Sequence, residues 1–247
     1  MGVDVFLELK GFGLCNELRT LMGHWYVAQQ KHGHLYVYWR VNRMCPDHFE
    51  NLFEPLKDTT FVRDLDDFKK RSRSTEKAIR FAGQTQIHSI LSRHGIKTSD
   101  KLLGDIYQQL KPKADIQAAI DGFLSKHDGL KAYKGLHVRR SDHVAFIVRL
   151  KGTYTKDEHF ETIIEKDKTQ RFYLATDNKK TQEQFASKYP DQIVVYKDIA
   201  DVKAIRKTPL SHAVIDLYLL GHCKKIHGSL GSSFSEGAQY LQLALRS

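Results

Sequence analysis

The stretch Gly135-Leu136-His137-Val138-Arg139-Arg140-Ser141-Asp142 decides how this chain is interpreted. The mostly apolar residues 133–138 predict a short buried strand, and two adjacent arginines and an acid follow it directly. Because neighbouring side chains of a strand point to opposite faces, His137 and Arg139 are expected to share one face. A guanidinium at the end of a buried strand needs an anionic partner to offset its desolvation.

Two interpretations of Arg139 follow from this position. Ligands of open α/β sheets bind at the carboxyl ends of the strands, so one interpretation is a diphosphate clamp in which Arg139 grips phosphate oxygens beside His137. The other is an ion pair with Asp142 or a neighbouring acid that holds the strand end together. The flanking sequence favours the first interpretation.

Strand and helix patterns alternate on both sides of this stretch, which indicates an α/β fold with parallel sheets. Strands are expected at residues 3–9, 35–39, 133–138, 171–175, 192–196 and 223–228, and helices at 17–31, 48–56, 156–166, 181–188, 209–220 and 232–243. Residues 57–75 look like an irregular charged excursion, and helical patterns dominate from 75 to 127. We predict two Rossmann-like halves that face a cleft, 1–130 and 131–247.

The first strand is followed by a glycine loop that matches only part of a dinucleotide-binding fingerprint. Gly11 and Gly13 occupy its first two glycine positions, but Asn16 replaces the third. The acid expected after the second strand is also missing, so a nicotinamide-dependent oxidoreductase is a poor interpretation. The loop either presents backbone N–H groups to a phosphate at a helix N-terminus or simply forms a tight turn.

Three polar segments are expected to meet at one sheet edge in the second half. They begin at His137, at Thr176-Asp177-Asn178 and at the glycine/serine turn of residues 228–233. That turn opens a helix, so it either offers N–H groups and hydroxyls to phosphate oxygens or only caps its own helix. Asp177 is expected to hold Arg139 or to bind a nucleotide, and Asp216 either accepts from a guanine or is a surface carboxylate.

These segments together resemble the fucosyltransferase-like superfamily, which includes nodulation chitooligosaccharide fucosyltransferases, core α1,6-fucosyltransferases and protein O-fucosyltransferases. The similar segments span nearly the whole chain: 13–19, the HxRRxD element at 137–142, 172–177 and 216–233. The resemblance implies a GT-B-like fold that binds a GDP-sugar, usually GDP-fucose, in the second half. It also implies inversion at the anomeric carbon and no metal or other cofactor.

The resemblance also implies roles for individual residues. Arg139 would stabilise the β-phosphate of the departing GDP, and Asn16 would lie near a glycan acceptor in the first half. The donor GDP-sugar would be contacted by the side chains or backbone of His137, Arg139, Arg140, Asp177, Asp216, Ser232, Ser233, Gly11 and Gly13.

Two departures from the family pattern leave the general base open. The segment after Asp142 lacks the glutamate that some core fucosyltransferases carry there, and Asn178 stands where those relatives have a second aspartate. Asp142 and Glu17 are the candidate bases, and transfer without a protein base is the third alternative.

Composition narrows the remaining classes. The net charge of +10 favours polyanionic partners, but the basic run at 69–73 is more typical of a solvated face than of a nucleic-acid site. The three widely spaced cysteines favour a reducing compartment over a disulfide framework. Neither they nor the thirteen histidines show metal-ligand spacing, so no metal is expected. No apolar run reaches membrane-spanning length and no signal peptide is evident, so we expect a cytoplasmic protein without a transmembrane segment.

The leading hypothesis is therefore an inverting glycosyltransferase that moves fucose or another 6-deoxyhexose from a GDP-sugar to a glycan hydroxyl. Alternatives are a transferase using another nucleotide sugar and a non-catalytic glycan- or nucleotide-binding protein on the same scaffold. The pattern does not identify the acceptor, the linkage, the oligomeric state or the choice between fucose and a sugar such as rhamnose.

Overall fold

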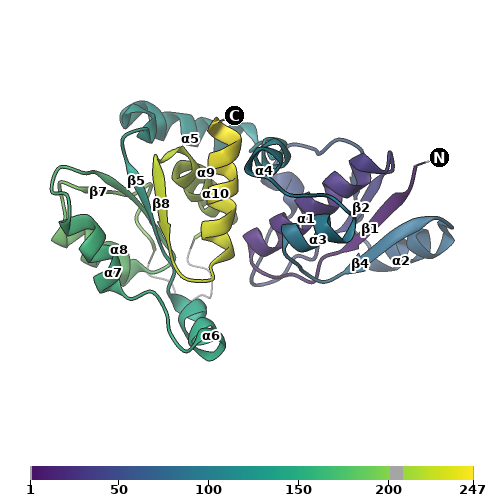
Figure 1. Ribbon diagram of the computed structural model, residues 1–247, viewed down its shortest axis with the longest axis horizontal. Coiled ribbons are helices and arrows are strands. Elements are labelled where there is room, and N and C mark those ends of the chain that lie inside the picture. The colour runs from purple at the N-terminus through teal and green to yellow at the C-terminus, as the bar shows by residue number, and fades with distance from the viewer. Residues whose placement is uncertain (1, 201–207, 247) are drawn as a thin grey trace. The chain divides into compact units, whose positions relative to one another are not determined.

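The computed structural model describes residues 2–200 and 208–246, which form ten α-helices, two 3-10 helices and eight strands in the described part of the chain (Figure 1). The chain divides into two compact units, Met1–Lys113 and Ala114–Arg246. The division therefore lies before helix α5 (Ala114–Lys126), which packs against α9 (Leu210–His222), instead of near residue 130.

The first unit contains a parallel sheet with the strand order β3-β2-β1-β4. Its strands are β1 (Asp4–Glu8), β2 (Leu35–Tyr38), β3 (Thr59–Phe61) and β4 (Ala78–Ala82). Helix α1 (Leu14–Gln30) covers one face, where His24 packs against Phe81, and it also contacts α3 (Ile87–Arg93) and α4 (Asp100–Tyr107). Helix α2 (Leu65–Ser74) covers the other face and packs Phe68 against Phe6.

The second unit contains a parallel sheet with the strand order β7-β6-β5-β8. Its strands are β5 (Lys134–Val138), β6 (Phe172–Thr176), β7 (Ile193–Val194) and β8 (Lys225–Gly228). Helices α7 (Asp157–Glu165) and α8 (Lys179–Lys188) bury Leu136 and Leu174 in the core of one face. On the opposite face, α9 contacts β5 and β6, and α10 (Ser233–Arg246) contacts α9 and β8.

Both sheets have the same topology. In each, the first strand lies in the interior, the second and third follow on one side, and the fourth pairs on the other side. The connections between strands therefore change from one face of the sheet to the other at a switch point. This point lies between β1 and β4 in the first unit and between β5 and β8 in the second. Such a switch point is where ligands of open α/β sheets bind.

The α/β class, the parallel sheets and most of the second half were predicted correctly. The helical interpretation of 75–127 was wrong at β4, and the irregular interpretation of 57–75 was wrong at β3 and α2. Helix α2 forms because Asp64 caps it through the N–H of Asp67 at 2.7 Å and because Phe68 is buried on its inner face. The helix predicted at 48–56 is only a 3-10 turn, Phe49–Asn51, and α6 (Ser141–Lys151) was not predicted.

Cys15, Cys45 and Cys223 are buried thiols and form no disulfide. Within residues 2–200 and 208–246, no helix is long and apolar enough to cross a membrane. The same residues contain no group of three or more His, Cys, Asp or Glu side chains placed to hold a metal ion.

Candidate functional site

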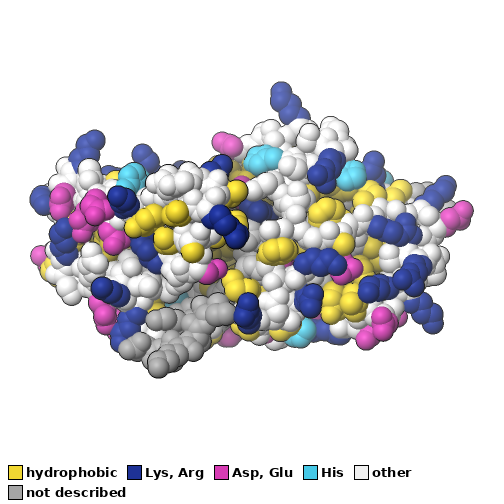
Figure 2. Space-filling model, turned by 90° about the horizontal axis from the view of Figure 1, so that it is seen from below, with side chains coloured by type: hydrophobic (Ala, Val, Ile, Leu, Met, Phe, Trp, Pro, Cys, Tyr) yellow, Lys and Arg dark blue, Asp and Glu magenta, His cyan; other side chains and the backbone are white. Residues whose placement is uncertain are grey.

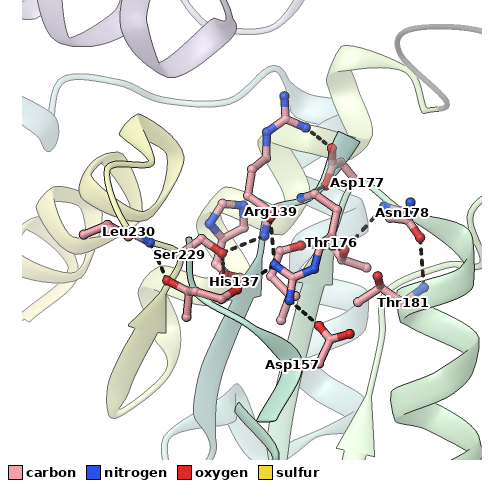
Figure 3. Close-up of polar contacts among 12 residues, drawn as sticks. His137, Arg139, Asp157, Thr176, Asp177, Asn178, Thr181, Ser229 and Leu230 are labelled. Carbon is pink, nitrogen blue, oxygen red and sulfur yellow. Dashed lines mark hydrogen bonds and ion pairs between the residues drawn. The ribbon is translucent and has the colours of Figure 1, made fainter. Parts of the chain in front are cut away.

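The carboxyl ends of β5 and β8 are held together by the serine that follows β8. The Ser229 hydroxyl donates to the carbonyl of His137 at 3.1 Å and accepts from the backbone N–H of Arg139 at 2.9 Å (Figure 3). On the other side of β5, the Thr176 hydroxyl donates to the carbonyl of Val138 at 2.6 Å. These bonds fix the backbone at the point where the strand ends and Arg139 begins.

Arg139 extends from this edge between two carboxylates. Its guanidinium pairs with Asp177 (Figure 3). It also donates to Asp142 at 2.7 Å. The Arg139 side chain keeps 24% of its surface exposed, so a ligand has access to it. The predicted ion pair is thus present, and it holds the guanidinium at a strand end where an anionic ligand would meet it.

Arg140 points away from Arg139 and is largely enclosed. Its guanidinium pairs with Asp157 and donates to the carbonyl of Thr155 at 3.0 Å, leaving 11% of the side chain exposed. Its backbone N–H donates to Asp177 at 2.7 Å. These contacts assign Arg140 to the support of the strand end, and its predicted contact with a nucleotide stays a prediction.

His137 lies beneath the first turn of α10. Its Nδ1 is 2.7 Å from the Ser235 hydroxyl, its ring stacks on Phe234, and only 4% of the residue is exposed. Burial lowers the pKa of His137 to about 3, and the charge of Arg139 acts in the same direction. A neutral imidazole therefore joins β5 to α10, while its predicted contact with guanine is untested.

Gly228 is needed for this junction. A Cβ at residue 228 would lie 2.2 Å from the Ser235 hydroxyl oxygen and 2.4 Å from its Cβ. We expect Gly228→Ala to displace Ser235 from His137 and to cost about 1–3 kcal/mol, which lowers the melting temperature by several degrees. Thermal denaturation measures this effect. The double variant G228A/S235G removes the clash, so its melting temperature should be close to that of S235G alone. Equal melting temperatures for G228A and wild type would contradict the assignment of Gly228 to this junction.

The serine turn leads into the N-terminus of α10. Ser232 is buried, Ser233 is half-buried and begins the helix, and the backbone N–H of Leu230 donates to the Thr155 hydroxyl at 2.8 Å. The first N–H groups of a helix lack partners within it and attract anions. This N-terminus follows β8 at the same switch point as Arg139.

Asn178 has an identifiable structural function. Its side-chain oxygen accepts from the N–H of Thr181 at 2.9 Å and caps α8 (Figure 3). An aspartate at this position would be an equally good cap. Asn178 therefore supports the local fold at the end of β6.

Asp216 is held on the α9 face of the second sheet. Its carboxyl accepts from the Tyr173 hydroxyl, its other oxygen is 3.5 Å from Nε2 of His212, and the side chain is 14% exposed. Burial raises the pKa of Asp216 to about 7 against the opposing effect of Tyr173, and burial lowers the pKa of His212 to about 4. The surface-carboxylate alternative is therefore wrong.

The glycine loop belongs to the first unit. Gly11 has φ +82° and its carbonyl accepts from Asn42, whereas Gly13 is extended and precedes the first residue of α1. Glu17 is 1% exposed and accepts the N–H of Phe12. Burial raises the pKa of Glu17 to about 7, against the lowering effect of the backbone N–H groups of this loop.

The predicted site residues thus form three groups in the structure. Arg139, Asp142 and Asp177 meet at the end of β5, with His137 beneath α10 and Ser232 and Ser233 at its start. Gly11, Gly13 and Asn16 surround the start of α1, and Asp216 joins Tyr173 and His212. Sequence reasoning included Ser229 only as a member of the serine turn and missed the functions of Ser235, Asp157 and Tyr173. The partners of these four residues lie between 17 and 98 residues away along the chain.

The two units, each with a parallel sheet of the same strand order, have the GT-B fold of the fucosyltransferases NodZ and POFUT1, and this fold is the one that the resemblance implied. Nodulation protein Z of Bradyrhizobium diazoefficiens is 24% identical to this chain, over 87% of this chain and 72% of its own length. No family model matches the sequence.

Solved structures agree with this assignment of the fold. The fucosyltransferase NodZ from Bradyrhizobium superposes with a TM-score of 0.61 at 16% identity, covering 96% of this chain and 93% of NodZ. NodZ α-1,6-fucosyltransferase soaked with GDP-fucose gives 0.61 at 19% identity, covering 97% and 92%. POFUT1 in complex with GDP gives 0.60 at 12% identity, covering 97% and 94%.

Proposed function

We propose that this chain is an inverting fucosyltransferase that moves fucose, or a closely related 6-deoxyhexose, from a GDP-sugar to a glycan hydroxyl. The observation that carries the proposal is the Arg139 guanidinium, partly exposed and fixed between Asp177 and Asp142 at the β5/β8 switch point. POFUT1, which has the same fold, has been solved in complex with GDP-fucose and with GDP. The second unit is accordingly the donor side and the first unit the acceptor side.

The chemistry of this site is leaving-group stabilisation. When the bond between the anomeric carbon and the phosphate oxygen breaks, its electron pair stays with the diphosphate while the sugar gains oxocarbenium character. Arg139 and the N-terminus of α10 stabilise that negative charge. The bonds of Arg139 to Ser229 and Asp177, and the bond between Ser235 and His137, hold them in place before the reaction. We propose that this suffices without a metal ion.

The acceptor hydroxyl attacks the anomeric carbon from the face opposite the diphosphate, so the configuration inverts and the hydroxyl proton must leave. Asp142 is 51% exposed and stays a candidate base, although it already pairs with Arg139. Glu17 is enclosed and holds the glycine loop through Phe12, which favours a positioning function for it. We therefore keep Asp142 or solvent as the destination of the proton.

A transfer assay tests the proposal. The purified protein is incubated with GDP-fucose and a panel of glycan acceptors, with and without excess EDTA, and the product is examined by NMR. We expect α-fucosylated product from the β-linked donor at equal rates with and without EDTA. Transfer from UDP-sugars alone would favour another nucleotide sugar, and tight GDP binding without transfer or donor hydrolysis would favour a non-catalytic binding protein.

The buried thiols agree with a reducing compartment, so we propose that the enzyme acts in the cytoplasm. Fractionation of the source cells with the native protein detected by antibody tests this location.

A further inference from the structure

The first sheet is covered unevenly on its two faces. Helix α1 covers one face together with α3 and α4, whereas α2, only ten residues long, covers the other. A cavity of about 330 Å³ lies between α2 and the β1–β4 pair. We call this cavity the α2 groove; its floor is formed by Phe6 and Phe68, and its rim includes Lys69, Arg73 and Arg80.

The α2 groove lies at the switch point of the first sheet. Glu8 and Ala82, which also line it, are the last residues of β1 and β4. These strands correspond in topology to β5 and β8, whose carboxyl ends carry Arg139 and the serine turn. Because ligands of open α/β sheets bind at this point, the groove occupies the position of a ligand site.

The groove has an excess of positive charge. Lys69 and Arg73 have no acidic partner within the described residues, and they also line an adjoining cavity of about 540 Å³ with Lys70 and Asp66. The acid on the groove itself, Glu8, is already paired with Lys10. Figure 2 shows Lys and Arg side chains beside hydrophobic ones on the first unit, which carries α2 and β4.

Arg80 shapes the groove without being free for a ligand. Its guanidinium donates to the carbonyls of Ser72, Thr75 and Ala78 and so satisfies the C-terminal end of α2. Lys69 and Arg73 project from the same helix, so the Arg80 contacts fix the helix that positions them. The groove therefore presents two cations, Lys69 and Arg73, that have no ion pair within the described residues, on a helix that Arg80 fixes in place.

The groove suits an acidic glycan better than a nucleic acid. Its volume is typical of sites for small ring systems, and ammonium and guanidinium groups bind carboxylate, sulfate and phosphate groups. Single-stranded nucleic acids gain affinity when their bases stack on exposed aromatic rings, whereas Phe6 is 1% and Phe68 is 4% exposed. The unpaired cations therefore match the acidic groups of a saccharide that bears carboxylate, sulfate or phosphate.

We propose that the α2 groove binds an acidic oligosaccharide through Lys69 and Arg73 and thereby selects an acidic glycan as the acceptor. The acceptor role of the bound glycan rests on the proposed transfer function, whereas the binding itself is independent of that function. The Lys69–Arg73 run, which the sequence placed on a solvated face, thus lies on a helix with a ligand-binding edge.

Calorimetric titration of a heparin-derived tetrasaccharide tests the proposal, with neutral chitotetraose as the second probe. We expect the heparin tetrasaccharide to bind wild type in 50 mM salt and its affinity to fall about 10- to 100-fold in K69E/R73E. The matched control is R93E/K97E, which makes the same change of net charge at exposed residues of α3 and the loop after it. The control should retain the wild-type affinity.

Three results would overturn the groove proposal: no binding of the heparin tetrasaccharide, equal losses in both variants, or chitotetraose binding as tightly. A single-stranded RNA oligonucleotide that displaces the tetrasaccharide and loses affinity only in K69E/R73E would assign the groove to nucleic acid instead. GDP titrated into K69E/R73E separates the two proposals, because donor binding should equal that of wild type whenever the donor site is correctly assigned.

Discussion

Replacing Arg139 with alanine is expected to lower the rate of GDP release from GDP-fucose by about 100- to 1,000-fold. Arg139 is the partly exposed cation at the end of β5, and its two carboxylate partners orient it before a diphosphate arrives. Its removal leaves the developing charge of the leaving group without a counter-ion and leaves Asp177 and Asp142 to repel the donor. Donor hydrolysis, followed as GDP formed per enzyme, measures the rate without knowledge of the acceptor.

Arg149→Ala is the matched control for this experiment. Arg149 is an exposed arginine in the last turn of α6 in the same unit and has no ion pair within the described residues. We expect R149A to hydrolyse the donor at the wild-type rate. Equal rates for R139A and R149A would show that the charge at the strand end is not used in the reaction.

Replacing Asp216 with asparagine is expected to change both the stability and the pH dependence of the protein. Because the folded pKa of about 7 lies above the ordinary value of 3.8, folded Asp216 holds a proton between about pH 4 and 7 that the unfolded chain has lost. Wild-type stability therefore falls as pH rises through this window. D216N should exceed wild type in melting temperature by about 3 °C or more at pH 8.5, and by clearly less at pH 5.

The same variant tests whether Asp216 recognises guanine. The N–H groups of guanine donate to an ionised carboxylate, so GDP binding to wild type must expel the proton below pH 7. With a pKa of about 7, we expect GDP affinity to be about 10-fold lower at pH 6 than at pH 8. D216N should lack the part of this dependence that Asp216 causes, keep the part that comes from the titration of the GDP phosphate itself, and bind GDP more weakly at pH 8. An identical pH profile in both proteins would remove Asp216 from the donor site.

The second half of the fold was predictable because its strands are continuous apolar runs bounded by polar turns. Residues 172–176, for example, are almost fully buried, and their pattern differs from that of the adjoining helices. The first half was predicted less well, since β4 is a partly exposed edge strand with Arg80 at its centre. Strand β4 forms because it pairs with β1, which lies far from it in the sequence. Such a long-range pairing leaves no periodic pattern in the local sequence.

The candidate site shows the same division between local and long-range information. The arginine pair and the serine turn could be identified because each is a local sequence feature at a strand end. Their separate orientations could not, because Arg140 is turned inward by Asp157, which comes from a different helix. Likewise, nothing near Asp216 in the sequence indicates that Tyr173 encloses it.

The most direct test of the central claim is a calorimetric titration of GDP, UDP and ADP, without metal, into wild type and R139A. The account predicts that GDP binds wild type more tightly than UDP or ADP and that R139A loses most of this affinity. If no nucleotide binds wild type, or if R139A binds GDP as tightly as wild type does, Arg139 is not a phosphate clamp and the proposed donor site is wrong.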